Sequence, residues 1–338
     1  MKHRTSISII ITLFIITSLS VSQAIDCKPG NGGSKVAYTI VVDQSEKANF
    51  KTIQAAIDSI PTNNDQWIKV QINPGIYTEQ VTIPPEKPCI FLEGQSSRLT
   101  TITYNAHERT DISATFTSRP SNIVAKGITF KNSFNRQLMQ KIYKEKELRH
   151  TVPAVSALIY GDKSAFYDCA FLGFQDTLCD ALGRHHLYNC YIEGAVDFIF
   201  GSGQSFYESC SINVTGGGYI TAQGREFPQD ANGFVFSGCN VYGLKGVRAY
   251  LGRAYRAYST VIFKDTFLSE VVEPLGWDSW TYVGHEGNFT YAEVNCKGLG
   301  SDTSKRASWV KKLDETQLNK FSKSSFIDQD GWLAKLPL

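Results

Sequence analysis

The chain is 338 residues long, 42% hydrophobic and 20% charged, a composition that predicts one large folded domain and excludes a disordered or collagen-like polymer. Its formal net charge is +2, and the balance becomes zero once Lys2 and Arg4 are removed with the apolar N-terminus, because 32 basic residues then face 32 acidic ones. This neutral balance offers no support for a nucleic-acid-binding protein.

The first 24 residues have the pattern of a secretory signal peptide. Basic residues precede an apolar run over 9–16, and Ser22 and Ala24 are the small residues before the expected cleavage site. The run is too short to span a membrane comfortably, so no membrane anchor is expected. The pattern therefore predicts a secreted protein.

After removal of the signal peptide, we expect a short N-terminal segment over 25–37 and one domain over 38–338. A single domain is expected because no Pro-, Ser- or Gly-rich linker divides the rest of the chain. Eight cysteines permit disulfides in an exported protein. The sequons at Asn213 and Asn288 are consistent with N-glycosylation along the same route. We expect a secreted glycoprotein.

An amphipathic helix is predicted over 50–60. Apolar residues recur on one helical face, Asn49 is the expected N-cap, and Pro61 ends the run. A stack of strands exposes its last rung, so we expect this helix to close one end of the domain.

The middle of the chain repeats a short pattern of aromatic, polar and small residues. Cys169, Cys190 and Cys210 recur at intervals of 21 and 20 residues, and Cys239 follows after a longer interval. A period in the twenties made of short β-favouring runs is typical of a solenoid. The sequence therefore predicts an all-β fold, a parallel β-helix. The repeated segments begin at Gly127, Ser164, His186, Gln204, Phe234 and Val261.

Two segments depart from the repeat. The charged stretch over 136–149 is interpreted as an excursion from the coil. After the turn region over 301–306, Leu313, Gln317 and Phe321 suggest a second helix. We expect this helix to close the other end of the solenoid.

The aligned cysteines have two interpretations. As small apolar residues at one place in the repeat, Cys169, Cys190, Cys210 and Cys239 would stack in the core, which we favour. Disulfides between neighbouring rungs are the alternative.

Two aspartates stand out because their neighbours are aromatic and apolar. Asp176 and Asp197 are 21 residues apart, which is one coil, so their backbones should lie about 5 Å apart on adjacent rungs. Two carboxylates that close do not both ionise freely, so one becomes an acid and the other a nucleophile. The alternative is a pair of hydrogen-bonded turn residues.

Five ordered blocks of the chain begin at Gly75, Gly173, Tyr191, Ile220 and Tyr250. Together they resemble the signature blocks of plant pectinesterases, the pectin methylesterases, from about residue 38 to the end. The resemblance implies a right-handed parallel β-helix and a carboxylic ester hydrolase that removes methyl esters from homogalacturonan. About a dozen residues precede the first strand, so the inhibitor-like domain of many plant members is not expected.

The same resemblance implies a role for each site residue. Asp197 would be the nucleophile, and Asp176 would protonate methanol and then activate water. Gln175 would donate a hydrogen bond to the oxyanion, and Arg253 would pair with Asp197, although a surface arginine is the alternative for Arg253.

Substrate-binding residues are implied in the same way. They are Thr115, Arg253, Tyr255 and Trp277, with Tyr255 in the place of the family's usual tryptophan. A phenol also stacks on a sugar ring, over a smaller area. For Thr115 and Trp277, simple packing is the alternative.

Pro153 is the main departure from the family pattern. The family commonly has glutamine there as a second oxyanion donor, and proline has neither a side-chain amide nor a backbone N–H. Ser156 and a bound water are the alternative donors. Losing one donor costs on the order of a hundredfold in turnover, so we expect an active enzyme of reduced rate.

The sequence leaves two rival functions open. One is a non-catalytic wall protein that binds pectin, which Pro153 alone favours. The other is a galacturonase or a calcium-dependent lyase on the same fold. No metal or cofactor is expected; the expected partners are homogalacturonan and a proteinaceous inhibitor, with the chain a monomer in the cell wall.

Overall fold

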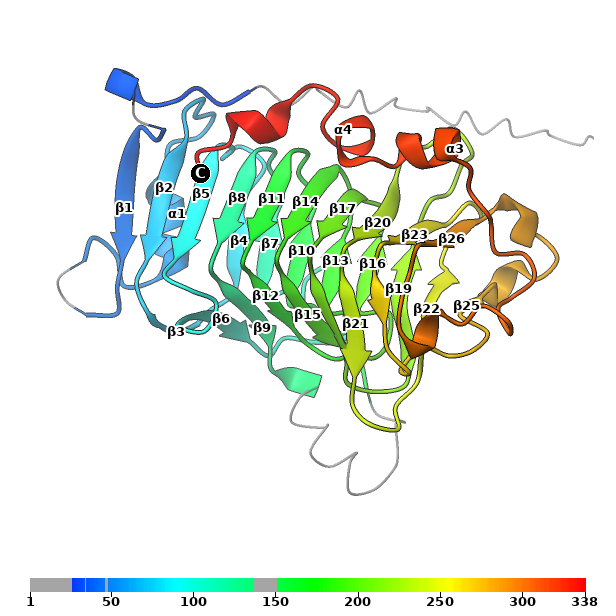
Figure 1. The fold of residues 1–338 in the computed structure, drawn as a ribbon. Coiled ribbons are helices and arrows are strands. Elements are labelled where there is room, and N and C mark those ends of the chain that lie inside the picture. Colours follow the sequence, from blue (N-terminus) through cyan, green and yellow to red (C-terminus); the bar gives the residue numbers. More distant parts are fainter. Residues whose placement is uncertain (1–25, 34, 46–47, 136–150) are drawn as a thin grey trace, which may run out of the picture.

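The structure is a computed structural model that describes residues 26–33, 35–45, 48–135 and 151–338. The expected signal peptide and the excursion over 136–149 lie outside these residues. Three parallel sheets of 10, 8 and 8 strands wind around one core, and each coil contributes one strand to each sheet over most of the length (Figure 1). The predicted parallel β-helix is confirmed.

Sheet 1 has ten strands in chain order. They are β1 (Tyr38–Val42), β2 (Ile68–Ile72), β5 (Ile90–Gly94), β8 (Ile123–Lys126), β11 (Ser164–Tyr167), β14 (Arg184–Tyr188), β17 (Gln204–Glu208), β20 (Gly233–Ser237), β23 (Thr260–Lys264) and β26 (Thr290–Val294).

Sheets 2 and 3 have eight strands each. Sheet 2 comprises β4 (Val81–Ile83), β7 (Phe116–Ser118), β10 (Ala157–Ile159), β13 (Leu178–Asp180), β16 (Ile199–Gly201), β19 (Gly218–Gln223), β22 (Ala249–Ala254) and β25 (Trp277–Asp278). Sheet 3 comprises β3 (Gly75–Thr78), β6 (Thr100–Tyr104), β9 (Thr129–Asn132), β12 (Ala170–Leu172), β15 (Tyr191–Gly194), β18 (Ser211–Val214), β21 (Asn240–Gly243) and β24 (Phe267–Leu268).

The corner between sheets 1 and 3 turns on one left-handed residue per coil. Small or polar residues take these places because glycine, asparagine and aspartate tolerate positive φ. From Gly127 to Asp265 each of these N–H groups donates to a carbonyl of the next coil, as from Asp168 to Tyr188, so the corner keeps successive coils in register. The residues are Gly127, Asp168, Asn189, Ser209, Gly238, Asp265 and Asn295.

Helix α1 (Ile53–Ser59) closes the N-terminal end of the core. Ile53, Ala56 and Ile57 are fully buried against the first coils. Its N-cap is Thr52, whose hydroxyl accepts from the Ala55 N–H, so the predicted Asn49 cap is wrong. Asn49 instead accepts a hydrogen bond from Val41 of β1, because a strand lies within its reach.

The C-terminal segment does not close the far end as predicted. Helices α3 (Glu315–Lys320) and α4 (Lys323–Phe326) exist, but the segment runs back along the outer face of sheet 1 and ends near β5 (Figure 1). Phe326 and Trp332 bury themselves against outward-facing apolar residues of that sheet. Trp309 packs on Phe289 and Tyr291 at the far end instead.

The aligned cysteines fill the core, as favoured. Cys169, Cys190, Cys210 and Cys239 are buried and carry free thiols, so disulfides between rungs do not form. Apart from them, a disulfide joins Cys27 of the N-terminal segment to Cys89, which precedes β5. Within the described ranges, no helix is long and apolar enough to cross a membrane.

Candidate active site

Two matching turns lead from sheet 3 into sheet 2. Asp176 and Asp197 occupy them with φ of 59° and 48°. Each turn begins with a glycine that has no room for a side chain: a Cβ on Gly194 would lie 2.2 Å from Phe198. The sequence thus requires glycine three residues before each aspartate, and the left-handed conformation then points the backbone into the next strand.

The two aspartates are neighbours across adjacent coils. Gln175 pairs with Val196 in a parallel bridge, and the Asp176 N–H donates to the Val196 carbonyl at 3.0 Å. The Thr177 hydroxyl donates to the Glu193 carbonyl at 3.0 Å, which ties the two turns together. The register predicted from the 21-residue spacing is confirmed.

Arg253 of β22 reaches back across β19 to one aspartate. Its Nε donates to Asp197 Oδ1 at 2.8 Å, and its Nη2 donates to Oδ2, which gives a bidentate pair. The side chains are 18% and 13% exposed, so the pair is little screened by water. Arg253 is therefore not a free surface arginine, and among the described residues only Asp197 of the two aspartates has an ion-pair partner.

The pairing makes the two carboxyl groups different. Burial raises the pKa of Asp176 to about 7, with the nearby Asp197 carboxylate as the second cause. Burial also raises the pKa of Asp197, but the hydrogen bonds and charge of Arg253 oppose this. The pKa of both carboxyl groups is thus raised, and only at Asp197 does an arginine oppose the rise, so Asp176 is the member more able to keep its proton near neutral pH.

Gln175 and Tyr255 remain candidates on this face. Gln175 directly precedes Asp176 and is partly exposed, and its amide makes no hydrogen bond to the described residues, so it is available as a donor. Tyr255 is 43% exposed and stacks with Trp280 at 6.1 Å between ring centroids. Its predicted contact with substrate stays a prediction.

Thr115 and Trp277 cannot serve as predicted in this structure. Thr115 is fully buried, and its hydroxyl donates to the Lys131 carbonyl. Trp277 faces the core, stacked on Tyr291 at 4.4 Å, with its Nε1 donating to Glu293. Alternation along β25 puts Trp277 inward, so the packing alternative is the correct one.

Sequence reasoning missed the aromatic residues that contact Arg253. The guanidinium carbon lies 3.9 Å from the ring centroid of Trp280 and 4.6 Å from that of Tyr219. Tyr219 occupies the place in its coil that Asp197 occupies in the preceding one, as the pairing of Ile199 with Thr221 shows. The one-coil spacing between Asp197 and Tyr219 could have predicted from the sequence that Tyr219 lies beside the site.

Pro153 lies one coil before Gln175. It is partly exposed, its carbonyl accepts from Glu108, and the N–H of Ala154 donates to the Gln175 carbonyl. Ser156 is fully buried, and its hydroxyl donates to the Thr177 carbonyl, so it is not an available oxyanion donor. Of the two alternatives, the structure removes Ser156.

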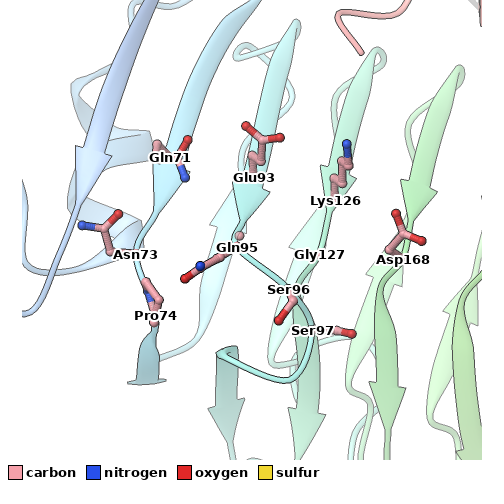
Figure 2. Close-up of a pocket in the computed structure, with 11 residues that line it drawn as sticks. Gln71, Asn73, Pro74, Glu93, Gln95, Ser96, Ser97, Lys126, Gly127 and Asp168 are labelled. Atoms are coloured by element: carbon pink, nitrogen blue, oxygen red, sulfur yellow. The ribbon is translucent and has the colours of Figure 1, made fainter.

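A separate pocket of about 590 Å³ lies at the corner between sheets 1 and 3 (Figure 2). Glu93, Lys126 and Asp168 line it with small polar residues, and Glu93 is already paired with Lys69 at 2.9 Å. None of the candidate catalytic residues lines this pocket.

Comparison with known proteins places the chain in a family. The Pectinesterase family model matches residues 39–330. The chain belongs to the pectinesterase family. It is 47% identical to probable pectinesterase 55 and 46% identical to probable pectinesterase 29, both from Arabidopsis thaliana, over 98% of each chain. The family's enzyme class, ester hydrolase, follows for this chain.

Solved structures of the pectinesterase family share the fold. The pectin methylesterase from carrot has a TM-score of 0.80 at 27% identity, covering 91% of this chain and 97% of its own. The pectin methylesterase from Aspergillus niger in deglycosylated form has a TM-score of 0.75 at 26% identity, covering 92% and 98%. The right-handed parallel β-helix is thereby confirmed. The galacturonase and lyase alternatives share this fold, and it is the match to the Pectinesterase family model that removes their support.

Proposed function

We propose that the chain hydrolyses the methyl esters of homogalacturonan and releases methanol, with Asp197 as nucleophile and Asp176 as acid and base. The observation that carries the proposal is the pair of coil-adjacent aspartates, of which only Asp197 is paired with an arginine. A protein that only binds pectin has no need of this asymmetry.

In the first step, a carboxylate oxygen of Asp197 forms a bond to the ester carbonyl carbon. The carbonyl oxygen takes up the negative charge, and the Gln175 amide donates a hydrogen bond to it. As the oxyanion collapses, the bond to the methoxy oxygen breaks, and Asp176 gives its proton to that oxygen. Methanol leaves, and an acyl group remains on Asp197.

In the second step, the Asp176 carboxylate takes a proton from water as the water oxygen bonds to the acyl carbon. The bond between the acyl carbon and Asp197 then breaks. Galacturonic acid, a carboxylate Asp197 and a protonated Asp176 result, so the starting protonation states are restored. Arg253 orients Asp197 and opposes its protonation before the first step, and it stabilises the Asp197 carboxylate that is released in the second.

We further propose that the enzyme acts as a secreted monomer in the plant cell wall, where homogalacturonan is its partner and a proteinaceous inhibitor binds it. The sequence pattern of residues 1–24 supports secretion. Similarity to plant pectinesterases supports the location and homogalacturonan as the partner.

Purified protein should release methanol from methylated pectin without creating new reducing ends or unsaturated sugars. Because Asp176 must begin protonated and its pKa is about 7, kcat/KM should fall as pH rises above about 7. It should also fall in acid, where Asp197 takes up a proton. Methanol assays across pH 4 to 9 measure both limbs, and the absence of methanol at every pH would sink the proposal.

Pro153→Gln should raise kcat on methylated pectin by on the order of a hundredfold, because it restores a side-chain amide beside Gln175. Pro153 is partly exposed, and a glutamine at this place retains the carbonyl that accepts from Glu108. Pro153→Ala is the control, since it removes the ring and supplies no amide side chain. Equal rates for both variants would show that a different donor, such as water, already serves the oxyanion.

A further inference from the structure

The Arg253 side chain is held between two aromatic rings. Trp280 in the 3-10 turn η2 (Trp280–Tyr282) lies on it at 3.9 Å, and Tyr219 of β19 lies on it at 4.6 Å, both measured from the guanidinium carbon to the ring centroid. Both distances are those of cation–π contacts. The rings restrict the guanidinium, whose Nε and Nη2 then face Asp197.

A single carboxylate, that of Asp278, accepts hydrogen bonds from both aromatic residues. The Tyr219 hydroxyl donates to Asp278 Oδ2 at 2.8 Å, and the Trp280 backbone N–H donates to Asp278 Oδ1 at 2.7 Å. Asp278 of β25 is in register with Arg253 on the preceding coil. It therefore sits beside the arginine and fixes the aromatic residues that contact it.

Asp278 does not compete with Asp197 for Arg253. Both oxygens of Asp278 already accept hydrogen bonds, and no ion pair forms between Asp278 and Arg253 in the described part of the chain. Burial raises the pKa of Tyr219 to about 12, with its bond to Asp278 as the second cause, so the phenol stays a neutral donor.

We propose, on the basis of the function proposed above, that Asp278 is a positioning residue, which fixes Arg253 on Asp197 through Tyr219 and Trp280. A side chain as long as arginine loses much rotamer freedom in a fixed pair. The two rings remove that freedom before substrate arrives, so the pair with Asp197 forms without further ordering.

Loss of the connection should change the charge state of Asp197. The charged and titratable groups around it are Asp176 on the preceding coil and Arg253 on β22, with Tyr219 and Asp278 behind the arginine. A looser Arg253 opposes protonation less, so Asp197 binds its proton up to a higher pH. The acid limb of kcat/KM then moves upward in pH.

The test compares Tyr219→Phe with Tyr250→Phe. Tyr250 stacks on Tyr219 at 5.3 Å between ring centroids, and its hydroxyl bonds to none of the described residues, so it is a matched control. Hydrogen exchange of the Arg253 Nε–H is followed by NMR, with its signal assigned through Arg253→Lys. Thermal melting confirms that each variant is folded.

In Tyr219→Phe the exchange should accelerate by about tenfold, the equivalent of one lost hydrogen bond, and the acid limb should shift upward. Tyr250→Phe should change neither. Asp278→Ala should behave like Tyr219→Phe, whereas Asp278→Asn should retain the wild-type exchange rate, because an amide can accept from the Trp280 N–H and donate to the Tyr219 oxygen.

Equal exchange rates in Tyr219→Phe and Tyr250→Phe would overturn the proposal. The exchange measurement needs no turnover. A wild-type protein that releases no methanol therefore defeats the proposed function, while the Arg253 Nε–H still decides whether Asp278 positions the arginine.

Discussion

Asp197→Asn should abolish methanol release, with kcat lowered by at least about 10⁴-fold, while methylated oligogalacturonide still binds. An amide oxygen is a far weaker nucleophile than a carboxylate, so the acyl-enzyme intermediate does not form. The variant keeps an oxygen that can accept from Arg253 Nε, which now donates to Asp197 at 2.8 Å. Its fold should therefore survive.

Asp168→Asn provides the matched control for this result. Asp168 is also an aspartate with positive φ at a coil corner, but it is exposed between sheets 1 and 3 and accepts from Asn189 at 2.6 Å. Its loss should leave kcat unchanged. Methanol assays and calorimetric titration with oligogalacturonide separate turnover from binding, and a turnover near the wild-type value in Asp197→Asn would exclude the proposed nucleophile.

The adjacency of the two aspartates could be predicted from the sequence because the repeat length sets the register of the coils. Once Asp176 and Asp197 are one coil apart, parallel pairing brings them side by side whatever the other residues are. The same argument places the aligned cysteines in one buried column. These predictions succeeded because they depended on periodicity alone.

Orientation within a coil was harder to predict. In the short strand β25 alternation sends Trp277 into the core and Asp278 outward, and the residue that reaches Arg253 is Trp280, in the turn that follows. A tryptophan suits a core and a sugar-binding surface equally well, so the residue type did not decide between them. The register of β25 with β22 is what decides that Trp277 lies in the core.

The two ends of the chain were set by tertiary contacts. Phe326 and Trp332 bury apolar surface on the outer face of sheet 1, and this burial outweighs the local helical pattern that suggested a lid. The bond between Cys27 and Cys89 likewise joins segments 62 residues apart, a separation that no local pattern reveals.

Asp176→Asn should stabilise the folded protein at pH 8 while it removes the acid needed for turnover. The folded-state pKa of about 7 lies above the ordinary value of 3.8, so the folded state binds this proton more tightly than the unfolded state does. The stability linked to it is complete below about pH 4 and is lost as pH rises through about 7. At pH 8 the loss is roughly 4 kcal/mol, at 1.36 kcal/mol per unit of pKa.

Asparagine cannot ionise, so the variant escapes this loss. We expect its free energy of unfolding to exceed that of the wild type by about 2 to 4 kcal/mol at pH 8 and to differ little at pH 4, measured by urea denaturation. Asp265→Asn, at an exposed corner position, should show no such pH-dependent gain. An equal gain in the free energy of unfolding at both pH values would mean that ionisation of Asp176 does not destabilise the folded protein. The acid of the proposed mechanism would then lack the buried proton that it has to deliver to methanol.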